Sequence, residues 1–454
     1  MFVQIIVYNY YMTCKNLTFE ECELAILRSS VEKIEKIQGK ELIALDDTKK
    51  MISIVKSFIK NNKCILYGGT AINDVLPKKV QFYNYEYQFP DYDMFSPNAM
   101  EMAKLLADLF KEKGFYEIEA KAGVHYGTYK VFVNQIPVAD ITQLHKELYD
   151  AMWKRGKKIN GLMYSPINFL KQACYLELSR PRGDVDRWEK VYKRLTLLNK
   201  YYPLDYDCKK MIFETNCENT PILCSDAMNV VKQVLYHDDV VFIGKHANKF
   251  YTKNVPDIPK LPDLHQYSVI SINALSTCKK IMQALHKWSP VLKTYKPIGE
   301  LILEHYAIMI KDVPVCYIFT PVACHSYNVI NHSGVNIKIA SIDTLFSYYL
   351  AFIYTSRNYL QEQQILCLCS TLFHLQEQHR LTHKGIFQRF NINCYGTQQQ
   401  LKDIRAEKNK MYDTLKPGTK LYNTWFLKYQ PKTHKLKQQK SKTRKTNIKN
   451  NKQK

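Results

Sequence analysis

Apolar and polar positions alternate with a helical period in the first sixty residues. From Thr18 onward apolar residues recur every three or four positions, which predicts a helix with a capping box at Thr18 and Glu21 and an end near Gly39. The same period predicts a second helix over 46–60, and the apolar run 63–67 then predicts a short strand. The apolar positions of the first helix are Leu24, Leu27, Val31 and Ile34.

A glycine-rich turn follows this strand. Gly68, Gly69 and Thr70 interrupt the apolar run, and the helical period resumes over 71–76. Such an order of strand, turn and helix can bind anions, because glycines let backbone N–H groups approach a phosphate and the helix N-terminus directs its free N–H groups at it. On its own, however, Gly-Gly-Thr is more often a plain helix-capping turn, so phosphate binding needs a second signal.

Three aspartates supply that second signal. Asp91 and Asp93 are two positions apart on a predicted strand and therefore face the same side, and Asp140 lies in the apolar strand 136–141. Neighbouring carboxylates repel, and a buried one is costly unless a cation neutralises it. Two surface acids on a strand edge would explain the first pair alone. The third acid favours two Mg²⁺ or Mn²⁺ ions, which take oxygen ligands and support phosphoryl transfer.

The combination of Gly-Gly-[Ser/Thr], Asp-x-Asp and a third aspartate on a later strand resembles the nucleotidyltransferase superfamily. The closer resemblance is to the poly(A) polymerase catalytic subunits of large nucleocytoplasmic DNA viruses, the giant virus, asfarvirus and poxvirus type. It extends over about 46–205. The segments that carry it are 66–73, 89–98, 138–140, 176–184 and 187–194.

The resemblance implies a role for each acid. Asp91 and Asp93 are expected to bind the metal that holds the nucleotide phosphates. Asp140 is expected to help hold a second metal, which activates the 3′-hydroxyl of an RNA. All three are therefore both the catalytic and the metal-binding candidates.

The resemblance also implies nucleotide contacts. The backbone of Gly68 and Gly69 and the hydroxyl of Thr70 would cradle the phosphates. Arg180 and Arg182 lie in the block that closes the site in the family and could bind phosphates through their guanidinium forks. The alternative for these two is a helix-entry loop with solvated arginines.

The reaction that the resemblance implies is template-independent transfer of AMP from ATP to an RNA 3′ end, with pyrophosphate release and Mg²⁺ or Mn²⁺ as cofactor. The adenine preference rests on the resemblance alone. A terminal uridylyl- or mixed-nucleotide transferase therefore stays open, as does an inactive RNA-binding scaffold. Expected partners are the RNA 3′ end and either a second copy of the chain or a viral processivity subunit, with no membrane. The expected location is the host cytoplasm, in a viral factory, or the virion.

The second half of the chain repeats the first in weakened form. The three matching pairs of segments, at offsets of 176, 175 and 177, are 65–72 with 241–248, 96–100 with 271–275, and 136–140 with 313–317. The acid positions fall near 267–269 and on Tyr317, where no carboxylate stands. This predicts a degenerate copy that cannot bind hard cations. Lys245 replaces Gly69 in it, either as an RNA contact or as part of a helix cap.

The charge of the chain adds a class of partner. Lys and Arg number 65 against 42 Asp and Glu, a net charge of +23, which favours a polyanion such as RNA. Residues 431–454 hold ten basic residues and no acid, and such a tail is predicted to be disordered. The tail either serves localisation and solubility or acts as a tether that raises the affinity for RNA. The candidate RNA contacts in it are Lys440, Lys442, Arg444 and Lys445.

The 13 cysteines show no CxxC pair and no repeating spacing, which predicts reduced thiols. A zinc site at the cluster of Cys367, Cys369, His374, His379 and His383 is not expected, because residues two apart on a helix lie on different faces.

Together these patterns predict a mixed α/β fold, a duplicated nucleotidyltransferase fold with an active first copy and a degenerate second copy. The expected parts are an N-terminal helical segment 1–60, a catalytic domain 61–219, a degenerate domain 220–400, a helical or linker extension 401–430 and a disordered lysine-rich tail 431–454.

Overall fold

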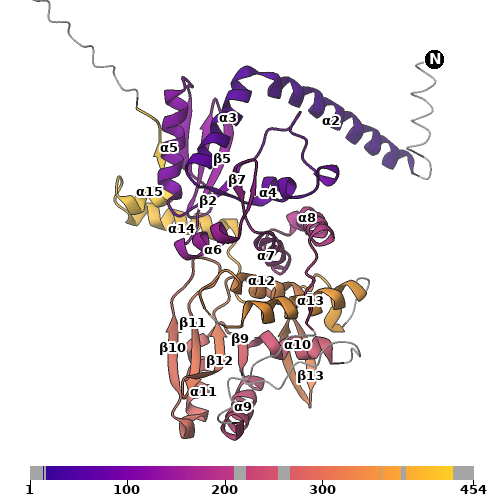
Figure 1. The fold of residues 1–454 in the computed structure, drawn as a ribbon, viewed down its shortest axis with the longest axis vertical. Helices are drawn as coiled ribbons and strands as arrows, with labels where there is room; N and C mark the ends of the chain where they lie inside the picture. The colour runs from indigo at the N-terminus through magenta and orange to yellow at the C-terminus, as the bar shows by residue number, and fades with distance from the viewer. Residues whose placement is uncertain are drawn as a thin grey trace, which may run out of the picture.

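A computed structural model describes residue 14 and residues 17–208, 221–253, 266–357, 359–379 and 385–432. The fold is mixed α/β, as predicted, and its two halves lie one above the other (Figure 1). Each half is built around an eight-stranded mixed sheet. No helix among the described residues is long and apolar enough to cross a membrane. Of the predicted basic tail, all residues after Lys432 lie outside the described part of the chain.

The first sheet has the strand order β16-β3-β4-β5-β2-β1-β7-β6. Its strands are β1 (Ile65–Leu66), β2 (Asp93–Ser96), β3 (Ile118–Ala122), β4 (Thr128–Val133), β5 (Ile136–Gln143), β6 (Lys157–Ile159), β7 (Leu162–Tyr164) and β16 (Lys428–Tyr429). The helices of this half are α2 (Phe19–Ala44), α3 (Asp46–Asn61), α4 (Gly68–Val75), α5 (Ala99–Glu112), α6 (Lys146–Arg155), α7 (Ile167–Leu178) and α8 (Trp188–Tyr201).

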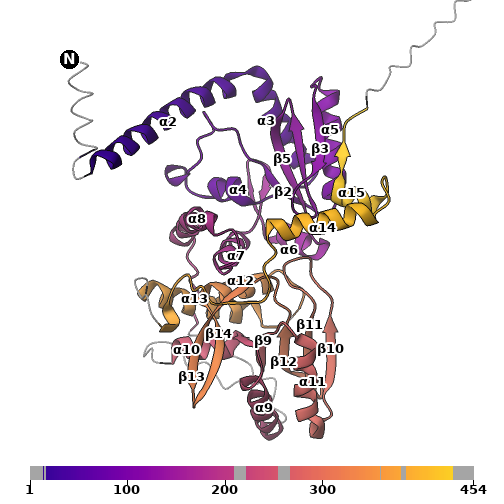
Figure 2. The same ribbon diagram turned by 180° about the vertical axis from the view of Figure 1, so that it is seen from behind.

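Helix α2 confirms its predicted start and corrects its predicted end. Thr18 and Glu21 form the capping box, but the helix continues past Gly39 to Ala44. A Cβ at Gly39 would collide with the backbone carbonyl of Tyr87, so this glycine is needed for close packing of the 81–92 segment and does not end the helix. The four predicted apolar positions are 45–59% exposed, and α2 extends from the body as an arm (Figures 1 and 2).

The second sheet has the order β10-β11-β12-β9-β8-β14-β13-β15. Its strands are β8 (Val241–Ile243), β9 (Tyr267–Ile270), β10 (Val291–Tyr295), β11 (His305–Ile310), β12 (Val313–Phe319), β13 (His325–His332), β14 (Val335–Ala340) and β15 (Cys394–Tyr395). The helices that follow in this half and beyond it are α9 (Pro221–Tyr236), α10 (Gly244–Thr252), α11 (Ala274–Ala284), α12 (Ile342–Phe352), α13 (Glu362–Gln378), α14 (Leu401–Thr414) and α15 (Lys420–Phe426).

Seven strands of each sheet follow the same order and orientation. β2 runs antiparallel to β1 and parallel to β5, as β9 does to β8 and β12. The turn after the first strand also has the same backbone, with φ of +71° at Gly68 and +70° at Gly244. In the register of the sheets Ser268 pairs with Tyr317 where Asp93 pairs with Asp140. The position that corresponds to Asp91 is therefore Gln266, one residue earlier than the sequence offsets indicated.

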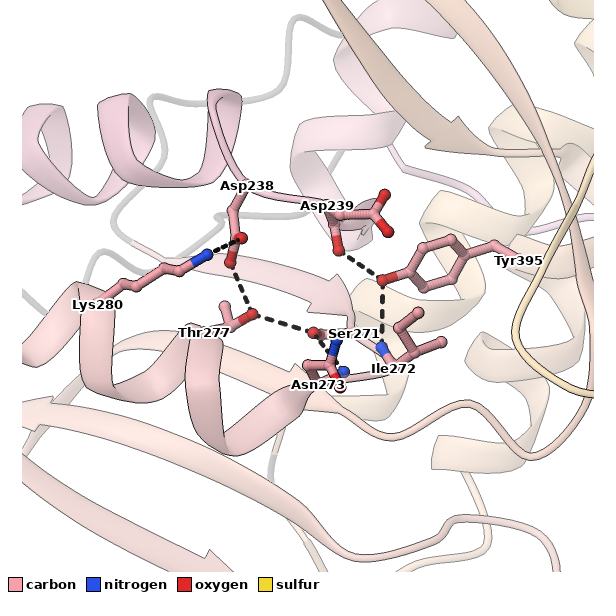
Figure 3. Close-up of polar contacts among 8 residues, drawn as sticks. All are labelled: Asp238, Asp239, Ser271, Ile272, Asn273, Thr277, Lys280 and Tyr395. Carbon is pink, nitrogen blue, oxygen red and sulfur yellow. Dashed lines mark hydrogen bonds and ion pairs between the residues drawn. The ribbon is translucent and has the colours of Figure 1, made fainter.

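Polar contacts fix the turns of the second sheet to one another (Figure 3). The Asp238 carboxylate accepts hydrogen bonds from Lys280 and from the Thr277 hydroxyl, which in turn lies 3.0 Å from the Ser271 hydroxyl. The Tyr395 hydroxyl donates to the carbonyl of Asp239 and accepts from the N–H of Ile272. The short strand β15 is thus tied to the ends of β8 and β9.

The two halves are joined by packed helices and by charge. The α7 side chain Tyr175 packs on Phe346 of α12, with ring centroids 4.5 Å apart. The guanidinium of Arg155 on α6 donates to both carboxylate oxygens of Glu362 on α13, at 2.5 and 2.8 Å. Such bidentate pairs fix orientation as well as proximity.

The extension 401–430 forms α14, α15 and β16 and returns from the second half to the first (Figure 2). The Lys408 ammonium donates to the carbonyl of Gly123 at 2.6 Å, and Trp425 packs on Tyr126 with ring centroids 4.6 Å apart. Strand β16 then pairs with β3 and completes the edge of the first sheet.

The prediction that all thiols are reduced is wrong for six cysteines. The structure pairs Cys14 with Cys22, Cys208 with Cys367 and Cys324 with Cys394, at Cα separations of 5.2, 5.5 and 5.3 Å. The fold brings the second pair together across 159 residues and the third across 70, so the local spacing carried no signal of them.

We expect the Cys208–Cys367 bond to stabilise the chain by about 2–4 kcal/mol, because a cross-link over so long a loop restricts the unfolded state. Cys367→Ser should lower the free energy of unfolding of the oxidised protein by this amount in denaturant titrations. Adding reductant should lower the free energy of unfolding of the wild type by more than it lowers that of the variant. Equal denaturation midpoints for oxidised wild type and Cys367→Ser would contradict this.

Candidate active site

The sheet brings the glycine turn and two of the aspartates to one place. β1 runs directly into the turn, and the N–H of Tyr67 donates to the carbonyl of Asp93 at 3.0 Å. β5 lies on the other side of β2, with Asp93 and Asp140 in register as Cα partners on parallel strands. The side chains of these two residues therefore share one face of the sheet.

Both glycines of the turn have close neighbours, and Gly68 also has a positive φ. A Cβ at Gly68 would lie 3.1 Å from Cγ of Asp93, and nearer still to its Oδ2, and the positive φ disfavours other residues. A Cβ at Gly69 would lie 2.7 Å from the Tyr83 hydroxyl and 2.9 Å from Nη2 of Arg194. The turn thus lies between a carboxylate and a guanidinium.

The Thr70 hydroxyl is used to position the first acids. It is buried and donates to the backbone carbonyl of Asp91 at 2.6 Å. Its contact holds the segment that carries Asp91 and Asp93 against the start of α4. Its predicted contact with phosphate stays a prediction.

Burial and neighbouring carboxylates raise the pKa of Asp91 and of Asp93. The pKa of Asp93 is raised to about 7, first by burial and then by the charges of Asp91 and Asp140. Burial and the charge of Asp140 also raise the pKa of Asp91. Lys130 and Arg194 oppose these shifts without cancelling them.

This electrostatic imbalance fits a bound cation. Carboxylate oxygens are the ligands that Mg²⁺ and Mn²⁺ prefer, and a divalent ion would stabilise the charged form of Asp93. Within the described ranges no three His, Cys, Asp or Glu side chains are gathered tightly enough to ligate an ion as they stand. The Asp140 carboxylate is ion-paired with Lys130 on β4. Metal binding would require Asp140 to exchange this lysine for the ion.

Three basic residues at the site were missed by the sequence patterns. Lys130 pairs with Asp140 across β4 and β5, while Lys190 and Arg194 are four apart on α8 and act on Asp91. The Arg194 guanidinium donates to the Tyr83 hydroxyl at 2.7 Å and lies 5.2 Å from the centre of the Phe82 ring. Lys190 and Arg194 lie in the segment 187–194, which carries part of the family resemblance, but the resemblance assigned no role to either of them.

The two arginines predicted to bind nucleotide differ in their exposure to solvent. Arg180 is half-buried, its pKa is lowered by burial, and the charged groups near it are Glu177 and Arg187. It also lies near His325 of the second half, next to the hydrogen bond from the N–H of Ser326 to the carbonyl of Ser179. Arg182 is exposed. Nucleotide binding by both arginines stays a prediction.

In the second half Lys245 is half-buried, and burial lowers its pKa. The neighbouring His246 is buried, with a pKa lowered to about 3 by burial, and lies 3.2 Å from the Tyr236 hydroxyl. RNA binding by Lys245 stays a prediction. The candidates Lys440, Lys442, Arg444 and Lys445 lie outside the described residues.

The cysteine–histidine cluster gives no zinc site in the part of it that the structure describes. Cys367 is bonded to Cys208, Cys369 is buried, and α13 ends at Gln378, before His379. His383 lies outside the described residues.

Comparisons with known proteins identify the part of the chain that holds this site. Residues 53–184 match the family Poly(A) polymerase catalytic subunit. The matched residues include the glycine turn, Asp91, Asp93 and Asp140. The family resemblance expected from the sequence is therefore confirmed over this part of the chain.

Two viral relatives are each similar to less than half of this chain. A putative poly(A) polymerase catalytic subunit of African swine fever virus (isolate Pig/Kenya/KEN-50/1950) is 32% identical over 196 residues, 42% of this chain and 41% of that protein. One from Acanthamoeba polyphaga mimivirus is 26% identical over 210 residues, 45% of this chain and 35% of that protein. The alignments thus span less than half of each relative.

The fold has a wider match. The crystal structure of the Megavirus polyadenylate synthase superposes with a TM-score of 0.77 at 19% identity, covering 92% of this chain and 86% of that one. The likeness in fold therefore includes both halves, whereas the family model matches residues of the first half.

We expect the raised pKa of Asp93 to make stability fall as pH rises. A carboxyl whose pKa is about 7 in the folded state and 3.8 otherwise binds more protons when folded, so stability is lost between about pH 4 and pH 7. At about 1.4 kcal/mol per unit, the shift of about 3 units sets an upper limit of about 4 kcal/mol on the gain of Asp93→Asn at pH 8, and the gain at pH 4 should be small. Denaturant unfolding in EDTA at both values would measure this.

Asp150→Asn is the matched control, because Asp150 is an exposed aspartate paired with Lys146 on α6. Mg²⁺ at pH 8 should stabilise the wild type and the control and have little effect on Asp93→Asn. If the free energy of unfolding depended on pH in the same way in Asp93→Asn and in the wild type, the raised pKa of Asp93 would not be the cause of the loss of stability.

Proposed function

We propose that this chain is an RNA 3′-adenylyltransferase that adds AMP from ATP to an RNA 3′-hydroxyl without a template. The observation that carries the proposal is the pairing of Asp93 with Asp140 on parallel strands beside the Gly68–Gly69 turn, inside the segment that matches the family. The relatives' names, as poly(A) polymerase catalytic subunits, support the choice of reaction.

Asp91, Asp93 and Asp140 would hold Mg²⁺ or Mn²⁺, which supplies charge neutralisation at the phosphates and a more acidic 3′-hydroxyl. In the reaction the 3′-oxygen forms a bond to the α-phosphorus of ATP, the bond from that phosphorus to the bridging oxygen breaks, and pyrophosphate leaves. The hydroxyl proton is lost to solvent or to a carboxylate at the site.

The chain's own basic groups have distinct tasks in this scheme. Lys190 and Arg194 lie on the Asp91 side and would neutralise the charge that grows on the departing pyrophosphate. Arg194 is held by Tyr83 against the second glycine of the turn, so its guanidinium is already oriented. Lys130 stands on the Asp140 side, where the RNA 3′ end would enter.

The second half would then be a degenerate copy without a catalytic ion. Gln266, Ser268 and Tyr317 stand in place of the three aspartates. Tyr317 packs on Tyr359, with ring centroids 5.4 Å apart, so aromatic side chains fill the position of the third acid. This contrast within one chain argues against an inactive scaffold, because the first half kept all three acids. We further propose that the chain acts with a partner, either a second copy of itself or a separate processivity subunit. Its proposed location is the viral factory or the virion.

We expect Asp93→Ala and Asp140→Asn to lower the rate of nucleotide addition at least about 10³-fold, since each removes a ligand from the ion site. The assay incubates the full-length protein with a short RNA and each NTP alone, with Mg²⁺, with Mn²⁺ or with EDTA. A ladder with ATP alone supports adenylylation, and Asp150→Asn should retain it.

Three results would contradict the proposal. A ladder of equal strength with UTP or with all four nucleotides would indicate a different transferase. Near wild-type addition by a folded Asp93→Ala protein would remove the aspartates from the chemistry. Tight RNA binding by the wild type with no addition under any metal would indicate a scaffold.

A further inference from the structure

A row of lysines leads from the site to the edge of the first sheet. Asp93 pairs with Asp140, Asp140 with Lys130, Lys130 with Lys121, and Lys121 with Lys428. Five adjacent strands, β2, β5, β4, β3 and β16, thus place two acids and three lysines in one register row. We call Lys130, Lys121 and Lys428 the lysine row. At about 4.8 Å between strands it extends about 14 Å beyond Asp140.

The lysine row lies on the face of the sheet that α5 leaves free. Tyr129 and Val131, the neighbours of Lys130, are buried, and Ala120 beside Lys121 is buried too. The hydroxyl of Tyr429 donates to Asp108 of α5 at 2.7 Å, so Lys428, one residue earlier, faces the opposite side.

The row is accessible to a ligand. The side chain of Lys130 is 38% exposed and that of Lys121 41% exposed, and Lys428 is exposed as well. Each of the first two has an acidic neighbour, Asp140 for Lys130 and Glu119, at 3.2 Å, for Lys121. Lys121 also lies 4.2 Å from the centre of the Phe132 ring, on the same face.

We propose that the lysine row binds the phosphate backbone of the RNA as it leaves the Asp140 side of the site. The proposal rests on the function proposed above, and it assigns the RNA path to β4, β3 and β16. Single-strand binders combine a basic groove with aromatic rings, and the row joins three cations to Phe132. Spacing along the sheet suits an extended chain of phosphates, whereas a triphosphate would occupy only the end nearest Asp140.

The sequence after the row strengthens the choice of RNA. Lys428 is followed four residues later by Lys432, and nine further basic residues lie in the chain beyond it. Because β16 anchors this end of the chain at the edge of the first sheet, the basic sequence begins where the row ends.

The test measures RNA binding without catalysis. A 5′-labelled 15-nucleotide RNA is titrated with full-length protein in EDTA, without ATP, over a range of salt concentrations. Each lysine that neutralises a single-strand phosphate contributes about 0.7 to the slope of log K against log salt. The double variant Lys121→Gln and Lys428→Gln should therefore flatten the slope by about 1.4 and weaken binding for all sequences alike.

The matched control is Lys49→Gln with Lys146→Gln. Both residues are exposed lysines with an acidic partner on their own helix, and they lie on α3 and α6. This pair should leave the slope unchanged. As a second readout, RNA with 4-thiouridine three to five positions from its 3′ end should cross-link to peptides of β3, β4 or β16. Addition of a first nucleotide at saturating RNA should survive in the row variant.

An unchanged slope in the row variant, or an equal change in the control pair, would overturn the proposal. A raised KM for ATP with unchanged RNA binding would assign the row to the triphosphate and also overturn it. If the wild type binds RNA through the row but adds no nucleotide, the lysine row stands and the proposed function fails.

Discussion

The repulsion between closely placed carboxylates is the constraint on which the rest of the site depends. Asp93 and Asp140 are neighbours on parallel strands, with Asp91 two residues before the first. Burial, together with the charges of Asp91 and Asp140, raises the pKa of Asp93 to about 7. The surrounding residues respond to that charge: Lys130 pairs with Asp140, Arg194 lies across the turn, and Gly68 leaves room for the Asp93 carboxylate.

The second half shows what happens when this constraint is absent. Its sheet has the same strand order, and Gly244 has the same positive φ as Gly68. Tyr317 stands where Asp140 does, and its partner on β11 is Ala307, where β4 carries Lys130. The second half thus lacks both the carboxylate and the lysine that pairs with it. This is expected if the lysine is needed only beside a carboxylate. The strand order therefore forms without the aspartates and the lysine, whereas these residues are brought together only by that strand order.

The features that the sequence predicted depend on residues close together along the chain. The capping box at Thr18 and the strand before Gly68 follow from spacings of a few residues, and the structure has both. The strand predicted through Asp91 and Asp93 is shorter than expected, because β2 begins at Asp93 and Asp91 lies two residues before it. Prediction failed where the deciding neighbour is distant. Gly39 was interpreted as a helix end, because its contact with Tyr87 cannot be inferred from local pattern.

The same reason explains the rest of the site and the cysteines. Lys130 became part of the site only through the register of β4 with β5, and register is set by pairing and turn geometry rather than by composition. The family resemblance located the acids but not their countercharges. Cys208 and Cys367 are joined over 159 residues, so their spacing looked unpatterned although the fold makes them neighbours.

The C-terminal extension places the end of the described chain, and the lysine in β16, beside the first half. Chain order would assign the last residues to the second half, but α14 and α15 cross back to the first, where Lys408 and Trp425 contact the β3–β4 turn. Strand β16 then covers the open edge of β3, where unpaired backbone groups would otherwise be exposed. One short strand therefore completes the sheet that carries the aspartates and adds a lysine to their register row. The two roles are coupled, because any change that releases β16 from β3 removes both the edge cover and the end of the row.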